Sequence, residues 1–323
     1  MQILKSPNFN FVRWRWHAIA LSVIVIGIGL ATILTRGLPL GVEFEGGTIV
    51  ILKFEQEPDI SAIRAALASG LPEGDDAIVQ RYGEPDRHEV MIRVSDVGEE
   101  TAGELSRTAD AVEQTVRKAN VGNFIREGTQ IVGPIVGDQL KRQGVLATVL
   151  ALAGILAYIA MRFQLSFAIG AVVATVHDLM VTLTFLAVFQ YDLTLNVIAG
   201  ILTITGYSVN DTIVVFDRVR ENMRAMRRDK LDHIVNVAVN QTLARTIITA
   251  GTTLLSVTAL FQFGGEVLKG FAFTMMVGIV AGTYSTVFIA AAIAIFWQGN
   301  KPIKGQTAPA AQPTERKRRA RAS

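Results

Sequence analysis

The sequence predicts a membrane protein that is all-α within the bilayer, with six transmembrane helices and one small α+β domain between the first and the second. Half of the 323 residues are hydrophobic and 18% are charged, and residues 18–34, 144–161 and 270–300 contain no charged side chain. A helix needs about 20 apolar residues to cross about 30 Å of hydrocarbon. Apolar runs of this length exclude an ordinary soluble protein.

Six segments are apolar enough to be spans. We expect the first to be retained, because it is long for a signal peptide and no convincing small-residue cleavage site follows it. The six expected spans are Ala18–Leu34, Gly144–Met161, Phe163–Gln190, Leu193–Phe216, Thr246–Phe263 and Gly270–Trp297.

The distribution of charge predicts the orientation. Residues 36–142 hold 12 Lys and Arg against 19 Asp and Glu, a net of −7, whereas the rest of the chain has a net of +10. Short basic loops stay in the cytoplasm, and long domains are translocated largely regardless of charge. The N-terminal tail, the loop after the fourth span and the C-terminal tail are all basic. We therefore expect both termini in the cytoplasm and the long loop in the periplasm.

The long loop has the pattern of a ferredoxin-like domain. Alternating or β-branched segments at Gly47–Glu55, Ala77–Tyr82, Glu89–Val94 and Asn123–Val132 predict strands. Helical spacing, with Asp59 or Ser61 as a cap and Gly70 as a stop, predicts a helix over Ile60–Ser69, and an apolar stripe predicts another over Thr101–Ala119. The resulting β-α-β-β-α-β order is that of the split ferredoxin-like motif.

Two further segments have patterns of their own. After the fourth span, Asp229–Thr242 has one apolar face, which favours an interfacial helix. The residues beyond Trp297 are rich in Pro, Ala, Gln, Lys and Arg, so we expect a disordered basic tail. The expected organisation therefore has four parts. They are 1–35 (N-terminal tail and first span), 36–143 (periplasmic domain), 144–298 (spans two to six, with the basic loop and interfacial helix at 217–245) and 299–323 (tail).

Several classes of function are not supported by the sequence. It contains no cysteine, which excludes disulfides, thiol catalysis and cysteine metal sites. The four histidines lack metal-ligand spacing, and there is no GxxxxGK[ST] motif for nucleotide phosphates. We therefore expect no enzymatic activity, no metal or organic cofactor, and no nucleic-acid partner. The basic tail could contact anionic membrane lipids, or it could be simply a solvated basic segment on the cytoplasmic side.

Ionisable side chains within the spans indicate a site. Each costs about 2.5–3.5 kcal/mol at the centre of a membrane helix. Asp211 lies near the cytoplasmic end of span four, and Arg245 directly precedes span five. Desolvation disfavours a charged carboxylate and a nearby cation favours it, so a carboxyl under both influences can exchange a proton when its surroundings move. We interpret this pair as a candidate proton relay, with Ser208 and Asn210 available to line a water path.

Structural interpretations remain open for these residues. Asp211 and Arg245 could form a buried ion pair, or the carboxylate could reach towards the interface. His177 and Asp178, in the middle of span three, form a second candidate polar site. They could take part in proton transfer, or they could tie span three to a neighbouring helix by hydrogen bonds.

Five sequence pieces resemble one known family. They are GVEFEGGT at 41–48 (which contains Glu43, Phe44, Gly46 and Gly47), VGPIVG at 132–137, His177–Asp178, GYSVNDTIVVFDR at 206–218, and Arg245–Thr246 with TAGTT at 249–253. Together they resemble SecF, the membrane subunit of bacterial SecDF complexes, in the RND superfamily, over about residues 8–298. One departure is Glu43, where that family more often has Asp; the carboxylate is kept.

The resemblance implies a function. Members of this family work with SecD, beside the SecYEG channel and often YajC, in the bacterial inner membrane. They use the proton-motive force to help complete the export of unfolded preproteins, with protons as the coupling ion. The family's proton-path residues match Asp211 and Arg245 here. The six spans correspond to half of an RND transporter, which leaves half of a small-molecule or lipid exporter as the alternative, and a purely structural subunit as a third hypothesis.

Overall fold

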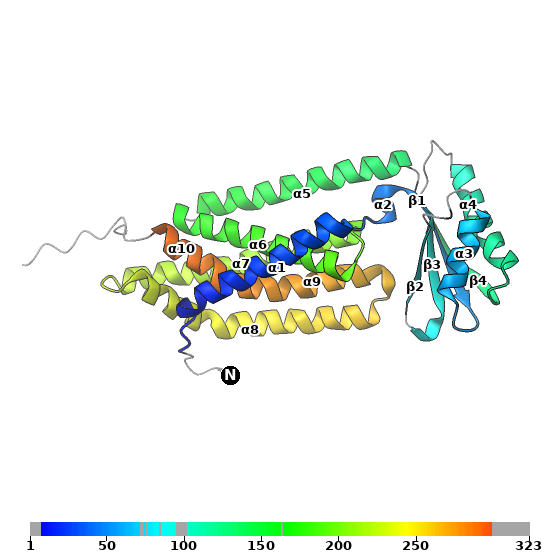
Figure 1. Ribbon diagram of the computed structural model, residues 1–323. Helices are drawn as coiled ribbons and strands as arrows, with labels where there is room; N and C mark the ends of the chain where they lie inside the picture. The colour runs from blue at the N-terminus through cyan, green and yellow to red at the C-terminus, as the bar shows by residue number, and fades with distance from the viewer. Residues whose placement is uncertain are drawn as a thin grey trace, which may run out of the picture.

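The computed structural model describes residues 8–71, 74, 77–83, 85–94, 102–132, 134–162 and 164–298. Six helical segments within these residues are long and apolar enough to cross a membrane. They form one elongated bundle, with a four-stranded sheet and its helices at one end (Figure 1). The beginning of the first long helix and the end of the last lie at the opposite end. The chain is thus a multi-pass membrane protein with one extramembrane α+β unit.

The bundle is built from helices whose apolar runs were evident in the sequence. A short turn, η1 (Val12–Trp14), leads into the first helix. The long helices are α1 (Arg15–Arg36), α5 (Pro134–Arg162), α6 (Leu165–Phe189), α7 (Leu195–Ala225), α8 (Leu231–Phe263) and α9 (Glu266–Ser285), the last continued by the π-turn η4 (Thr286–Ala290) and by α10 (Ala291–Gln298).

All six expected spans are found, but α5 is longer than its apolar run. It begins at Pro134 rather than Gly144. Proline suits the first position of a helix, because its missing N–H would be unpaired there. An ion pair of 3.0 Å between Arg142 and Asp138, one turn apart, supports the added polar turns. Phe163, expected to start the third span, lies outside the described residues.

The expected separate interfacial helix is wrong. Residues 231–263 form one continuous helix, α8, so the amphipathic segment and the fifth span are parts of the same element. The physical reason is local, since residues 240–245 contain neither Pro nor Gly to stop the helix. The apolar face is nevertheless used, because Ile234, Val235, Ala238 and Val239 are buried in the core at this end of the bundle.

The sheet domain has the predicted order of elements. Its strands are β1 (Gly47–Phe54), β2 (Ile78–Tyr82), β3 (Glu89–Val94) and β4 (Phe124–Val132), and its helices are α3 (Ile60–Gly70) and α4 (Ala102–Lys118), with a short turn η3 (Pro85–Arg87) in the hairpin. The strands are antiparallel in the order β2-β3-β1-β4. The first and third strands are central and the second and fourth are at the edges, which confirms the ferredoxin-like fold.

One face of the sheet holds the core of this domain. Residues Val50, Leu52 and Ile92 are fully buried there, against Ile63 and Leu67 of α3. As expected, Asp59 caps α3, because its Oδ1 accepts from the backbone N–H of two residues in the first turn. Helices α3 and α4 lie on the side of the sheet away from the bundle, so its other face is turned towards the membrane helices (Figure 1).

Candidate functional site

Asp211 lies on α7 and is only half-buried, but its two oxygens differ sharply. Oδ1 accepts a hydrogen bond of 2.8 Å from the Thr246 hydroxyl on α8. Oδ2 is shielded from solvent and has no hydrogen-bond partner. A buried carboxylate oxygen without a donor is costly, so this side chain is poised to gain a proton or a new donor.

The Asp211–Arg245 ion pair, one of the alternatives that the sequence left open, is not formed. In the described part of the chain, Asp211 accepts a hydrogen bond from Thr246 and has no ion pair with Arg245. The side chain of Arg245 is exposed instead. Adjacent helical residues point about 100° apart, so the residue that faces α7 is the threonine.

A polar cleft leads towards this carboxyl from the end of the bundle opposite the sheet. Its volume is about 280 Å³, and it is lined by Val214, Asp217, Arg218, Glu221, Gln241, Thr242 and Arg245. Val214 lies one turn from Asp211, and Thr242 lies one turn from Thr246. The Arg218 guanidinium donates to Gln241 at 2.7 Å and pairs with Glu221 at 2.6 Å, which joins α7 to α8. Arg245 thus belongs to the approach to Asp211.

His177 and Asp178 on α6 form a separate, deeper cluster. Asp178 is 3% exposed, and its Oδ1 lies 3.0 Å from Nδ1 of His177. Its Oδ2 accepts from the hydroxyls of Ser208 on α7, at 2.5 Å, and Ser285 on α9, at 2.8 Å. The other ring nitrogen of His177 lies 2.8 Å from the hydroxyl of Ser22 on α1. The cluster therefore joins side chains from four helices, α1, α6, α7 and α9.

A glycine allows the helices to meet at this cluster. A methyl group at Gly282 on α9 would lie 2.9 Å from the Cβ of Ser208, closer than real side chains approach. The glycine therefore lets α9 approach α7 closely at the point where Ser208 and Ser285 both donate to Asp178. Small residues commonly serve this purpose between membrane helices.

The two polar residues predicted to line a water path, Ser208 and Asn210, lie in different surroundings. Ser208 belongs to the buried cluster, but Asn210 lies on the exposed side of α7 and takes no part in it. Sequence reasoning missed Ser22, Tyr284 and Ser285. The available signal was their chemistry, because Ser22 is the only polar side chain between Ala18 and Ala31 of an otherwise apolar span.

The motif after the first span forms a joint between the sheet and the bundle. Glu43 and Phe44 lie in the short helix α2 (Val42–Glu45), and Phe44 is buried. Gly46 and Gly47 follow with φ of 77° and 121°, which only glycine adopts readily. A Cβ at Gly137 of α5 would lie 3.2 Å from the backbone nitrogen of Gly46. The two glycine-containing motifs therefore pack directly on each other.

The same joint is tied to the turn between α6 and α7. The N–H of Gly41 donates to the carbonyl of Leu193 at 2.9 Å, and the N–H of Leu193 donates to the carbonyl of Pro39 at 2.8 Å. Arg93 of β3 donates to the carbonyl of Leu40 at 2.7 Å and lies 3.5 Å from Asp192. The open face of the sheet is thus held against the helices that carry Asp178 and Asp211.

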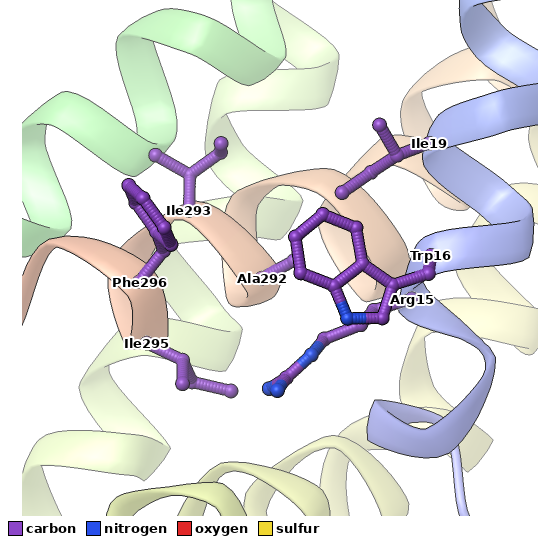
Figure 2. Close-up of a pocket in the computed structure, with 7 residues that line it drawn as sticks. All are labelled: Arg15, Trp16, Ile19, Ala292, Ile293, Ile295 and Phe296. Atoms are coloured by element: carbon purple, nitrogen blue, oxygen red, sulfur yellow. The ribbon is translucent and has the colours of Figure 1, made fainter. Parts of the chain in front are cut away.

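An apolar pocket of about 260 Å³ lies at the other end of the bundle, between α1 and α10 (Figure 2). Arg15 and Trp16 project from α1 towards Ile295 and Phe296. Nη1 of Arg15 is buried without a hydrogen bond, and it lies 3.5 Å from Asp232. None of the predicted site residues lines this pocket. Among the described residues, no group of three or more His, Asp and Glu could hold a metal ion.

Comparison with known proteins agrees with these features. The model of the family "Protein export membrane protein SecD/SecF, C-terminal" matches residues 111–300, and that of the "SecD/SecF GG Motif" matches residues 32–58. Curated relatives named "Protein translocase subunit SecF" are 43% identical in Calditerrivibrio nitroreducens, over 82% of this chain and 86% of the relative, and 40% identical in Pseudomonas aeruginosa, over 91% and 92%. The SecF of Escherichia coli O157:H7 is 36% identical, over 89% and 87%.

A solved structure supports the same assignment. The crystal structure of SecDF, a translocon-associated membrane protein from Thermus thermophilus, matches with a TM-score of 0.79 at 31% identity. The match covers 90% of this chain and 39% of that one, so this chain spans well under half of the SecDF chain. The chain therefore belongs to the SecF family of protein translocase subunits.

Proposed function

We propose that this chain is the SecF half of a proton-driven accessory complex that, with a SecD partner, assists the late steps of preprotein export by the Sec translocase. Support comes from the relatives named as translocase subunits and from the SecDF structure that the chain matches. In this proposal the chain is a transport subunit rather than an enzyme, protons are the coupling ion, and no other cofactor is needed. SecYEG, YajC, the preprotein and membrane lipids are its further partners.

In the proposed orientation, both termini are cytoplasmic and residues 36–143 are periplasmic. The charge distribution supports this, because the basic loops all lie on one side of six spans. Residues 1–35 and 144–298 then form the inner-membrane part, and the tail at 299–323 lies outside the described residues. The cleft lined by Arg218 and Arg245 opens to the cytoplasm in this arrangement.

The observation that carries the mechanism is the asymmetry of Asp211. One carboxylate oxygen is bonded to Thr246 and the other is buried without a donor, one turn from the end of a polar cleft. A proton on that oxygen would remove the free-energy cost of leaving it buried without a hydrogen bond. Arg245, which lines the cleft, would oppose protonation by stabilising the charged carboxylate. Each charge that crosses 100 mV supplies about 2.3 kcal/mol, so several protons per cycle could move the periplasmic domain.

The test is Asp211→Asn in the intact SecD–SecF complex. We expect ATP-driven translocation by SecA to persist in membrane vesicles, whereas its stimulation by the proton-motive force is lost. Asp229→Asn, in the exposed turn between α7 and α8, is the matched control and should behave as wild type. Full stimulation in assembled Asp211→Asn complexes would overturn the mechanism and favour a structural subunit. Normal secretion combined with drug or lipid sensitivity in a deletion strain would favour the exporter.

A further inference from the structure

We propose that His177 and Asp178 form a second proton-binding site, distinct from Asp211. A chain of hydrogen-bonded hydroxyl groups couples the protonation state of this site to helix α1. The proposal rests on the proton-coupled function above. It concerns the cluster of Ser22, His177, Asp178, Ser208, Tyr284 and Ser285, in which every side chain but Tyr284 is at most 8% exposed.

Both carboxylate oxygens of Asp178 already have hydrogen-bond donors. The hydroxyls of Ser208 and Ser285 point to Oδ2, and Nδ1 of His177 points to Oδ1. Because Nδ1 must then carry a hydrogen, the second ring nitrogen, Nε2, is the position that a further proton would occupy.

The hydroxyls beyond Nε2 can be arranged in two ways. Nε2 lies 2.8 Å from the Ser22 hydroxyl, which lies 3.3 Å from the Tyr284 hydroxyl, and the latter donates to the backbone carbonyl of Ala18 at 2.6 Å. If His177 is neutral, Ser22 must donate to Nε2, and no hydrogen remains for the contact between Ser22 and Tyr284. If His177 is doubly protonated, Nε2 donates to Ser22, Ser22 donates to Tyr284, and every contact is used.

The charge balance favours the second state once a proton can reach the site. With a neutral ring the buried cluster carries a net charge of −1, whereas the protonated ring and the carboxylate make a neutral pair. A buried charge is tolerated mainly when it is paired. Uptake of one proton therefore turns the Ser22 hydroxyl from the ring towards Tyr284 and strengthens the contact between α1 and α9.

Other ionisable groups near the cluster are few. Tyr284 on α9 stacks beside the His177 ring at 6.0 Å, and Asp211 lies one turn beyond Ser208 on α7. Between its end residues, Arg15 and Arg36, helix α1 has His17 as its only ionisable residue, and the charged residues of α9, Glu266 and Lys269, lie in its first turn. The segment η4 with α10 has no charged residue, and those of α5 lie near its ends. The state of His177 is thus set mainly by Asp178 and by the hydroxyl chain.

The direct test uses the SecD–SecF complex in lipid nanodiscs, with His177 as the only histidine of this chain. His17→Gln, His88→Asn and His233→Gln remove the other three, and asparagine is chosen at 88 because that residue has a positive φ. With histidine isotope-labelled in this chain alone, nitrogen NMR should show a neutral ring with the hydrogen on Nδ1 at high pH. It should show a doubly protonated ring once the pH is lowered. A ring that stays neutral down to the lowest pH at which the complex remains folded would overturn the proposal.

Two further variants separate this site from Asp211. Ser22→Ala removes the switching hydroxyl and should shift the transition, whereas Thr32→Ala, whose hydroxyl bonds only within α1 at 2.9 Å from the carbonyl of Ile28, should not. In Asp211→Asn the histidine transition should persist although export loses its proton-driven stimulation. If Ser22→Ala left the transition unchanged, the hydroxyl chain would be refuted. A transition that persists while Asp211→Asn exports normally would refute the proposed function and leave the proton site standing.

Discussion

Nη1 of Arg93, in the central sheet strand β3, lies 3.5 Å from Oδ2 of Asp192, in the turn between two membrane helices. The arginine side chain is 6% exposed, and it also donates to the carbonyl of Leu40 at 2.7 Å. Its charge is therefore largely removed from water and depends on these partners. Since the turn joins α6 to α7, this contact connects the helices that carry Asp178 and Asp211 to the open face of the sheet.

Removing this contact should loosen the domain from the bundle. Arg93→Gln loses the ion pair and leaves the Leu40 carbonyl with a weaker donor, so we expect a loss of about 2 kcal/mol in the free energy of unfolding. We also expect faster protease cleavage at the joint of residues 37–46. Arg81→Gln, whose pair with Glu57 is exposed on both sides, is the control and should change little. Equal cleavage of both variants would contradict the role of Arg93.

Close helix contacts at glycine should be sensitive to a single methyl group. At Gly278 of α9, a Cβ would collide with the side chain of Ile204 on α7, so Gly278→Ala should destabilise the folded protein by about 1–3 kcal/mol. At Gly206 of α7, nothing lies within 4 Å of the same atom. Gly206→Ala should therefore be neutral or slightly stabilising. Thermal unfolding of the purified chain in detergent would compare the two, and equal midpoints would show that α7 and α9 are not held this closely.

The open face of the sheet contains a carboxyl that should make stability depend on pH. Burial raises the pKa of Glu89 above its ordinary value, the neighbouring Glu127 raises it further, and Arg87 and Lys53 oppose the shift. The protonated form is thus favoured in the folded state. Its contribution is complete below the unfolded pKa and is lost as the pH rises through the folded one. The stability of Glu89→Gln relative to wild type, measured by denaturant unfolding, should improve as the pH rises from about 4.5 through the folded pKa and should then level off. A constant difference would contradict the shift.

The fold was predictable because its signals are coarse and local. A charge-free run such as 144–161 can only be a span, and alternation along 89–94 marks a strand whichever neighbours it has. The end of α5 towards the sheet and the start of α8 were missed for the opposite reason. There the helix continues past the apolar segment, and helical continuity depends on the absence of a breaker rather than on hydrophobicity.

The site was predictable in its residues but not in its contacts. The free-energy cost of placing a charged side chain in a membrane helix is enough to single out Asp178, Asp211 and Arg245 as candidate functional residues. Which neighbour each one meets depends on the rotation of one helix against another, and neighbouring positions such as Arg245 and Thr246 point in different directions. The serines at 22 and 285 gave only a weak signal, because isolated hydroxyls are common in membrane helices and usually bond to their own backbone.

The contact between Thr246 and Asp211 leads to the sharpest test of the relay. Thr246→Val keeps the shape of the side chain but removes the hydroxyl that donates to Oδ1 at 2.8 Å, so both carboxylate oxygens then lack a donor. The charged form becomes more costly, and release of the proton should become the slow step. We expect proton-driven export to fall about tenfold, which corresponds to about 1.4 kcal/mol, with the loss greatest at low external pH.

Thr246→Ser should restore the rate because it restores the donor. Thr249→Val, one turn away, removes a hydroxyl that bonds only to the backbone of its own helix at 3.0 and 3.1 Å, and should export as wild type. If Thr246→Val and Thr249→Val reduced export equally, the hydroxyl on Asp211 would have no special part in the cycle.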